Sequence, residues 1–191
     1  MGVLAIRKII IGILVISLFF ISVVIYNHKQ QPTMNDVFEI TKNWSPETEA
    51  VYLVKKIDGK WFTIFRNQHL VMIGELKQNR IGLWQLRDEM GLESSLTSTY
   101  YPPEKEDEIT WGATEIEEKE IVYYFGQVIN PEIQKLTVET NENPAEDVPL
   151  ITSNGNRFFF NKVKGKLVSP TNIRGFSKSG ELKYSTLPEK P

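Results

Sequence analysis

Cysteine is absent from the 191 residues of the chain, which excludes disulfide bonds, thiolate metal sites and a cysteine nucleophile. Attachment of lipid to an N-terminal cysteine is excluded for the same reason. An exported domain without disulfides must be stabilised by its hydrophobic core, and a domain of about 150 residues can bury roughly 70% of its unfolded surface. Disulfides are common in secreted eukaryotic proteins, so their absence favours a bacterial cell envelope.

Histidine is scarce as well, since the chain has only His28, beside the apolar N-terminal segment, and His69, between two expected strands. A lone histidine at the start of a strand is typically a surface turn residue. No Gly-x-Ser-x-Gly or Ser-x-x-Lys motif supports a nucleophilic serine, and no glycine-rich loop has the spacing of a phosphate site. The sequence therefore predicts no catalytic residue, no metal and no cofactor.

Acidic residues are missing from residues 1–30, which carry three of the 22 basic residues. The rest of the chain has 19 basic against 24 acidic residues, a formal charge of −5. Nucleic acids and anionic lipid surfaces attract a basic protein face. The charge of the main part of the chain therefore favours neither partner, and we expect no nucleic acid.

One long apolar run, Ile9–Tyr26, directly follows Arg7 and Lys8 and contains no charge. As a helix its eighteen residues measure about 27 Å, close to the hydrocarbon thickness of a bilayer. A cleaved signal peptide is the alternative, but no small-x-small cleavage site follows the run. Because basic residues near a span stay on the cytoplasmic side, we expect residues 1–8 to be a cytoplasmic stub. The remaining chain is then extracellular, on a single-pass anchor in the bacterial cell membrane.

Residues 27–48 are polar and contain Pro32 and Pro46, so we expect a juxtamembrane stalk with a helix-compatible stretch over residues 34–42. From there the pattern is β: segments rich in β-branched and aromatic residues are separated by turn residues such as Asp58-Gly59. About nine short strands are predicted within one domain of residues 49–186, with residues 91–108 and 141–149 as loops and 187–191 as a frayed tail. The expected fold class is an all-β ectodomain, a β-sandwich or a partly open barrel, with one N-terminal transmembrane helix.

Two groups of residues in the predicted loop over 91–108 are weak candidates for binding. Tyr100 and Tyr101 are aromatic residues outside the expected strands, where they could face a carbohydrate or a peptide. The acidic run after them concentrates hard oxygen ligands suited to Ca²⁺, although such runs are usually solvated loops. The candidate ligands in that run are Glu104, Glu106 and Asp107.

Basic residues gather in the C-terminal third of the chain, among them Lys162, Lys164 and Arg174. At strand spacing some of them share a face and form a local positive strip. Charged residues at the edge of a sheet oppose aggregation, so this strip is interpreted as edge protection rather than as an anion site.

Four segments carry a resemblance: VYLVKKIDGKWFTIFRN, GELKQNRIGLWQL, VYYFGQVINPEIQKLTVE and SPTNIRGFSKSGELKYS. Together they resemble a group of membrane-anchored or exported small β-domain proteins of Gram-positive bacteria, whose function is unassigned. The shared motifs are strands and turns. The resemblance therefore implies an extracytoplasmic β domain and carries over no active site.

The sequence thus favours a membrane-anchored envelope protein that acts as a non-catalytic interaction or binding module. Its expected partners are the membrane, through Ile9–Tyr26, and another envelope protein. One alternative is a cell-wall hydrolase, whose two carboxylates would flank the bond to be cleaved. A second alternative is a membrane-tethered sensor or immunity-type protein.

Overall fold

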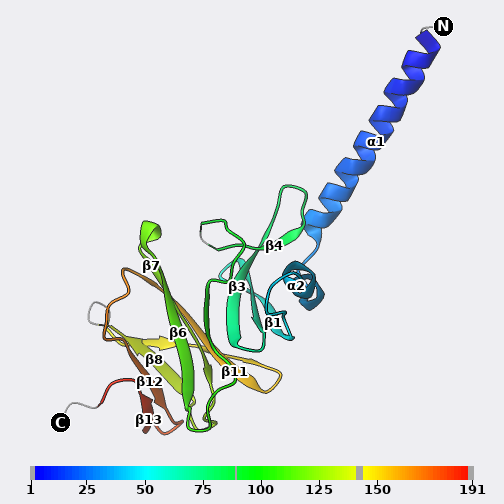
Figure 1. Cartoon of the computed structure of the whole chain (residues 1–191). Coiled ribbons are helices and arrows are strands. Elements are labelled where there is room, and N and C mark those ends of the chain that lie inside the picture. The colour runs from blue at the N-terminus through cyan, green and yellow to red at the C-terminus, as the bar shows by residue number, and fades with distance from the viewer. Residues whose placement is uncertain (1–2, 89, 141–143, 189–191) are drawn as a thin grey trace.

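The computed structural model describes residues 3–88, 90–140 and 144–188, and it has the mostly β fold with one N-terminal apolar helix that the sequence predicts (Figure 1). Helices α1 (Val3–Lys29) and α2 (Met34–Thr41) precede thirteen strands within the described residues, and a short 3-10 helix, η1 (Glu117–Lys119), lies before β7. The strands are β1 (Ala50–Ile57), β2 (Lys60–Arg66), β3 (Leu70–Gln78), β4 (Trp84–Leu86), β5 (Thr97–Tyr100), β6 (Ile109–Ile116), β7 (Ile121–Val128), β8 (Lys135–Glu139), β9 (Glu146–Val148), β10 (Leu150–Ser153), β11 (Asn156–Lys164), β12 (Asn172–Phe176) and β13 (Leu182–Ser185).

Helix α1 projects away from the β domain (Figure 1). Over Arg7–Lys29 it is long and apolar enough to cross a membrane, and it is the one such helix in the part of the chain that the structure describes. Nearly all of its apolar side chains from Ile9 onward are exposed rather than packed against the domain. An aliphatic helix of this length with no protein partner for its surface is typical of a membrane span.

The segment predicted to be a stalk, residues 27–48, lies largely against the domain. Helix α2 begins with a capping box, in which Thr33 Oγ1 accepts from Asp36 N at 3.2 Å and Thr33 N donates to Asp36 Oδ2 at 2.7 Å. The helix buries Val37 and Thr41 completely, and Val37 packs with Phe65 of β2. Only residues 30–33 connect α1 to α2.

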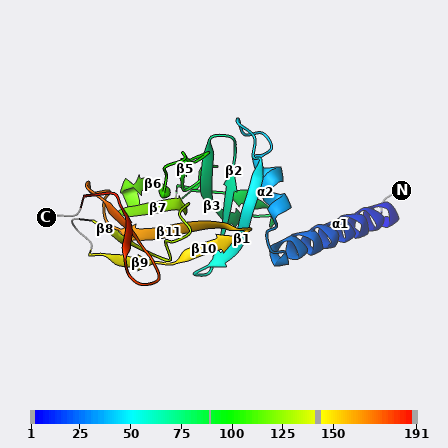
Figure 2. The same cartoon turned by 90° about the horizontal axis from the view of Figure 1, so that it is seen from below.

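The strands form three antiparallel sheets. Sheet A has the order β1-β2-β3-β4, with β5 also paired to β3; sheet B has the order β10-β11-β7-β6; and sheet C has the order β13-β12-β8-β9. Sheet B lies between sheets A and C (Figures 1 and 2). Helix α2 covers the other face of sheet A, so the layers run α2, A, B, C.

Strand β7 is buried on both faces because it belongs to the middle layer. Tyr123 and Phe125 pack toward sheet A with Phe62 and Ile73, whereas Val122 and Tyr124 belong to the cluster shared with sheet C. The run Phe158, Phe159 and Phe160 on β11 follows the same rule: the first and third contact the sheet A side, and the second contacts the sheet C side. Continuous apolar runs are typical of strands covered on both sides.

Parts of the two predicted loops are strands, which is one reason for thirteen strands instead of about nine. Residues 97–100 form β5 and pair with β3, and residues 146–148 form β9 and pair with β8. Both are short and polar, so they carry too little alternation to be recognised from the sequence. The predicted hairpin at Asp58-Gly59 is confirmed, and both turn residues have positive φ, 48° and 83°.

Candidate functional site

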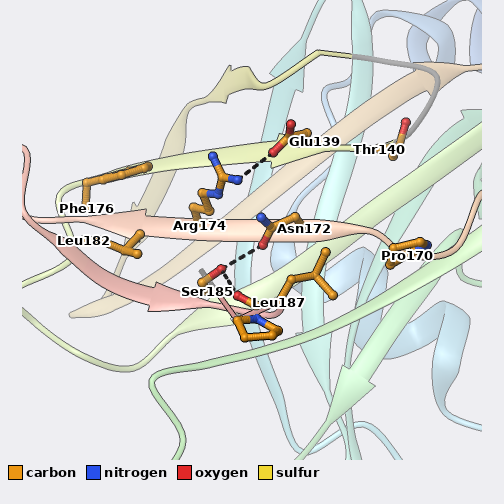
Figure 3. A pocket seen from close by; sticks show the side chains of 10 residues that line it. Glu139, Thr140, Pro170, Asn172, Arg174, Phe176, Leu182, Ser185 and Leu187 are labelled. Carbon is orange, nitrogen blue, oxygen red and sulfur yellow. Dashed lines mark hydrogen bonds and ion pairs between the residues drawn. The ribbon is translucent and has the colours of Figure 1, made fainter. Parts of the chain in front are cut away.

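A groove with a volume of about 710 Å³ lies on the outer face of sheet C (Figure 3). Alternation along β12 creates its floor: Ile173 points into the core between sheets B and C, so Asn172, Arg174 and Phe176 face the other way. The groove is also lined by residues of β8, of β13 and of the segments beside them: Glu139, Thr140, Pro170, Leu182, Ser185, Leu187 and Pro188.

The guanidinium of Arg174 is held in the middle of the groove. Its Nη2 lies 3.0 Å from Glu139 Oε2. The amide of Asn172, oriented so that both of its groups are paired, accepts from Arg174 Nε at 2.8 Å and from Nη2 at 3.0 Å. The ion pair is about 40% exposed at each partner, and exposed pairs contribute only about 0–1 kcal/mol to stability. Its main effect is therefore to orient the guanidinium.

The network continues from Asn172 to the end of β13. In the same orientation the amide nitrogen donates to Ser185 Oγ at 2.9 Å, and Ser185 Oγ donates to Leu187 O at 2.6 Å. Thr186 Oγ1 donates to Thr171 O at 2.9 Å, which links the residue after β13 to the residue before β12. These bonds fix the arrangement of the polar floor.

Apolar side chains flank the polar floor. Phe176 and Leu182 lie at one end of the groove and Pro170 at the other (Figure 3). Sites with an apolar lining and a few fixed polar groups are typical of ligand binding. Glu139 is the one carboxylate among the lining residues that the structure describes, whereas hydrolysis of a sugar requires two.

The sequence candidates Tyr100 and Asp107 lie away from this groove and contact each other. Tyr100 Oη donates to Asp107 Oδ2 at 2.7 Å, and Glu104 N donates to the same oxygen at 2.5 Å. The hydrogen bond to Asp107 raises the pKa of Tyr100 to about 12. Tyr100 remains 43% exposed, and its hydroxyl is engaged in holding the acidic loop.

Tyr101 and the other candidates do not form a second site with Tyr100. Tyr101 is half-buried against the core between sheets A and B, and the Arg66 guanidinium lies 4.5 Å from its ring centre. Glu106 is exposed, and Glu104 contributes its backbone to Asp107. Within the described ranges, no three His, Asp or Glu side chains lie together in a group that could hold a metal ion. His69 is exposed beside Gln68.

The groove residues were not singled out from the sequence. Arg174 was interpreted as part of an edge-protecting strip, and no sequence motif indicated a binding role for Asn172 or Glu139. The spacing of Asn172, Arg174 and Phe176 could have indicated a shared strand face. The concavity itself depends on how β8, β12 and β13 pair and on the chain after β13, which is not a local pattern.

Comparison of the chain with protein-family models, with curated proteins and with solved structures finds no match. A functional proposal therefore has to depend on the geometry of the residues themselves. Helix α1 and sheet C lie at opposite ends of the molecule (Figures 1 and 2). The residues thus offer an exposed apolar helix at one end and, on sheet C, the groove with its hydrogen-bonded polar floor.

Proposed function

We propose that the chain is a single-pass membrane protein of the bacterial envelope whose β domain is a non-catalytic binding module for another envelope protein. The exposed apolar surface of α1 supports the anchor. Arg7 and Lys8, before the apolar run, favour a cytoplasmic N-terminus and an extracellular β domain. The resemblance to anchored β-domain proteins of Gram-positive bacteria points to the same setting.

The groove on sheet C is the observation that carries the binding role. Its volume of about 710 Å³ lies within the range of specific ligand sites, roughly 300–1,000 Å³. The fixed guanidinium of Arg174 favours a carboxylate or amide, and Phe176 and Leu182 favour an apolar side chain beside it. A short segment of a partner protein with an acidic and an apolar residue combines these features.

The position of the groove fits this role. Sheet C is the layer farthest from α1 in both views (Figures 1 and 2). A domain held at the membrane by α1 would present this layer outward, where a partner protein could reach it. A hydrolase of the cell wall is less well supported because Glu139 has no second carboxylate opposite it among the described lining residues.

Co-purification from gently solubilised membranes tests the proposal. Tagged full-length protein is compared with Arg174→Ala and Leu182→Asp, which alter the groove, and with Lys178→Ala, a charge removal on the exposed turn outside it. We expect one envelope protein to be recovered with wild type and Lys178→Ala, and about tenfold less of it with the groove variants, the effect of roughly 1.4 kcal/mol. Equal recovery with all four proteins would contradict a binding role of the groove.

A further inference from the structure

The C-terminal end of α1 is fixed to the turn between β3 and β4, residues 79–83, which we name the elbow turn. Asn27 Nδ2 donates to Ile81 O at 3.1 Å. In the other direction, Gln78 Nε2 donates to Asn27 O at 2.9 Å and to Gly82 O at 3.2 Å. The helix end and the turn are therefore joined by bonds in both directions.

Gly82 allows this close approach. A Cβ at this position would lie 2.7 Å from both Asn27 Cβ and His28 Nδ1, distances that no real Cβ contact has, and the φ of +81° also disfavours other residues. Within the turn, Asn79 Oδ1 accepts from Ile81 N and from Leu83 N, each at 3.0 Å. The elbow turn thus has a defined conformation and a defined place beside α1.

Its place beside α1 sets its height relative to a bilayer. Asn27 directly follows Tyr26, the last residue of the apolar run, so the elbow turn meets the helix where it would leave the hydrocarbon. At that level Ile81 is 42% exposed and Leu83 is 51% exposed. Arg80, next to them, is exposed as well. Two aliphatic side chains and a guanidinium at this depth match the boundary between acyl chains and headgroups.

We infer that Ile81 and Leu83 insert into the surface of the same membrane that α1 crosses, an inference that depends on the proposed anchoring. Interfacial segments bury apolar side chains about 5–10 Å into the headgroup and acyl boundary. Here the anchor already holds the turn at the surface, so insertion does not have to supply the affinity for the membrane. The net negative charge of the domain does not oppose this insertion, because the contact with the membrane is made by the apolar side chains of Ile81 and Leu83.

Single cysteine substitutions test the insertion, since the natural chain has no cysteine to compete for the label. Full-length protein is labelled with an environment-sensitive fluorophore at Ile81→Cys, at Leu83→Cys or at Lys178→Cys, and reconstituted into vesicles of phosphatidylethanolamine and phosphatidylglycerol. Ser17→Cys, in the middle of α1, serves as the reference for anchoring. Nitroxide-bearing lipids then quench labels at known depths.

We expect shallow nitroxides to quench I81C and L83C at least about twofold more than K178C, because the label lies ~5–10 Å inside the boundary. Deep nitroxides should quench S17C. If S17C is quenched and both elbow labels behave like K178C, the insertion is overturned while the anchor stands. If S17C is not quenched either, the result contradicts both the proposed anchoring by α1 and the insertion of the elbow turn. Protection of I81C from a water-soluble maleimide without lipid quenching would show that protein covers the turn, which also overturns the inference.

Discussion

Replacing Gly126 by alanine should destabilise the fold strongly, because this glycine lies on β7 in the middle of the three sheets. A Cβ there would be 2.2 Å from Thr110 O of the neighbouring strand and 2.4 Å from Cε1 of Phe159. Phe159 is fully buried between sheets B and C. Its ring cannot move without displacing other core residues, and a backbone oxygen has no rotamer that would relieve the contact.

The size of the effect follows from these contacts. Added methyl groups in packed cores usually cost about 1–3 kcal/mol, and two unavoidable overlaps put Gly126→Ala at the upper end, about 3 kcal/mol. For a chain of this size, 1 kcal/mol corresponds to roughly 2–4 °C in Tm, so we expect Tm to fall by about 6–12 °C.

Thermal unfolding of the full-length protein in mild detergent, followed by tryptophan fluorescence, measures this change. Gly155→Ala is the matched control: its turn has a φ of +79° and open space around the missing Cβ, so only backbone strain of about 1–2 kcal/mol is added. A Tm of Gly126→Ala no lower than that of Gly155→Ala would refute the packing of sheet B between two sheets.

Three further predictions concern individual contacts. Tyr100→Phe should remove a tyrosinate that forms near pH 12 in an absorbance titration. The folded-state pKa of about 12 exceeds the ordinary tyrosine value of 10.0, so this hydrogen bond stabilises the fold below pH 10 and its contribution is lost as the pH rises through 12. Gly82→Ala should increase protease cleavage between α1 and α2, whereas Gly59→Ala, with a similar φ and open space, should not. Arg157→Met removes the guanidinium that donates to two backbone carbonyls, Ile133 O and Asn130 O, and should lower the free energy of unfolding by about 1–3 kcal/mol in a denaturant titration.

Each of the three has a contrary outcome. An alkaline titration of Tyr100→Phe with an unchanged tyrosinate signal near pH 12 would assign that pKa to another tyrosine. Equal cleavage of the two glycine variants would mean that the elbow turn does not restrain the end of α1. An unchanged denaturation midpoint for Arg157→Met would show that water replaces the guanidinium at no cost.

Local patterns predicted the elements with strong alternation or clear turn chemistry. Strands β1 and β2 are joined at Asp58-Gly59, which forms the predicted turn. Strand β5 was not predicted because its sequence is polar. Thr97 and Thr99 are buried only because β5 pairs with the distant strand β3, and a local pattern does not indicate such a contact. The three phenylalanines from Phe158 pack in two different interfaces, which depends on the stacking of the sheets and not on a local pattern.

The candidate site was harder to predict than the fold. Tyr100 and Tyr101 are adjacent aromatics, yet one holds an acidic loop and the other packs beside Arg66. Local sequence patterns do not show which residues of other segments these two side chains contact. Arg174 was recognised as basic and exposed, but its role in the groove depends on Glu139, 35 positions away in the chain and brought beside it by pairing of β8 with β12.

The junction at Asn27 also has a mechanical consequence. Only residues 30–33 lie between the two helices, and Pro32 among them is buried. The elbow turn and the neighbouring Gln78 form hydrogen bonds with Asn27 at the end of α1. A short connection with hydrogen bonds to the helix end restricts rotation of the domain relative to α1. Membrane-spanning helices tilt by about 20° on average. In the proposed membrane setting, a change of the tilt of α1, for example in a thinner bilayer, would therefore reorient the groove on sheet C relative to the membrane.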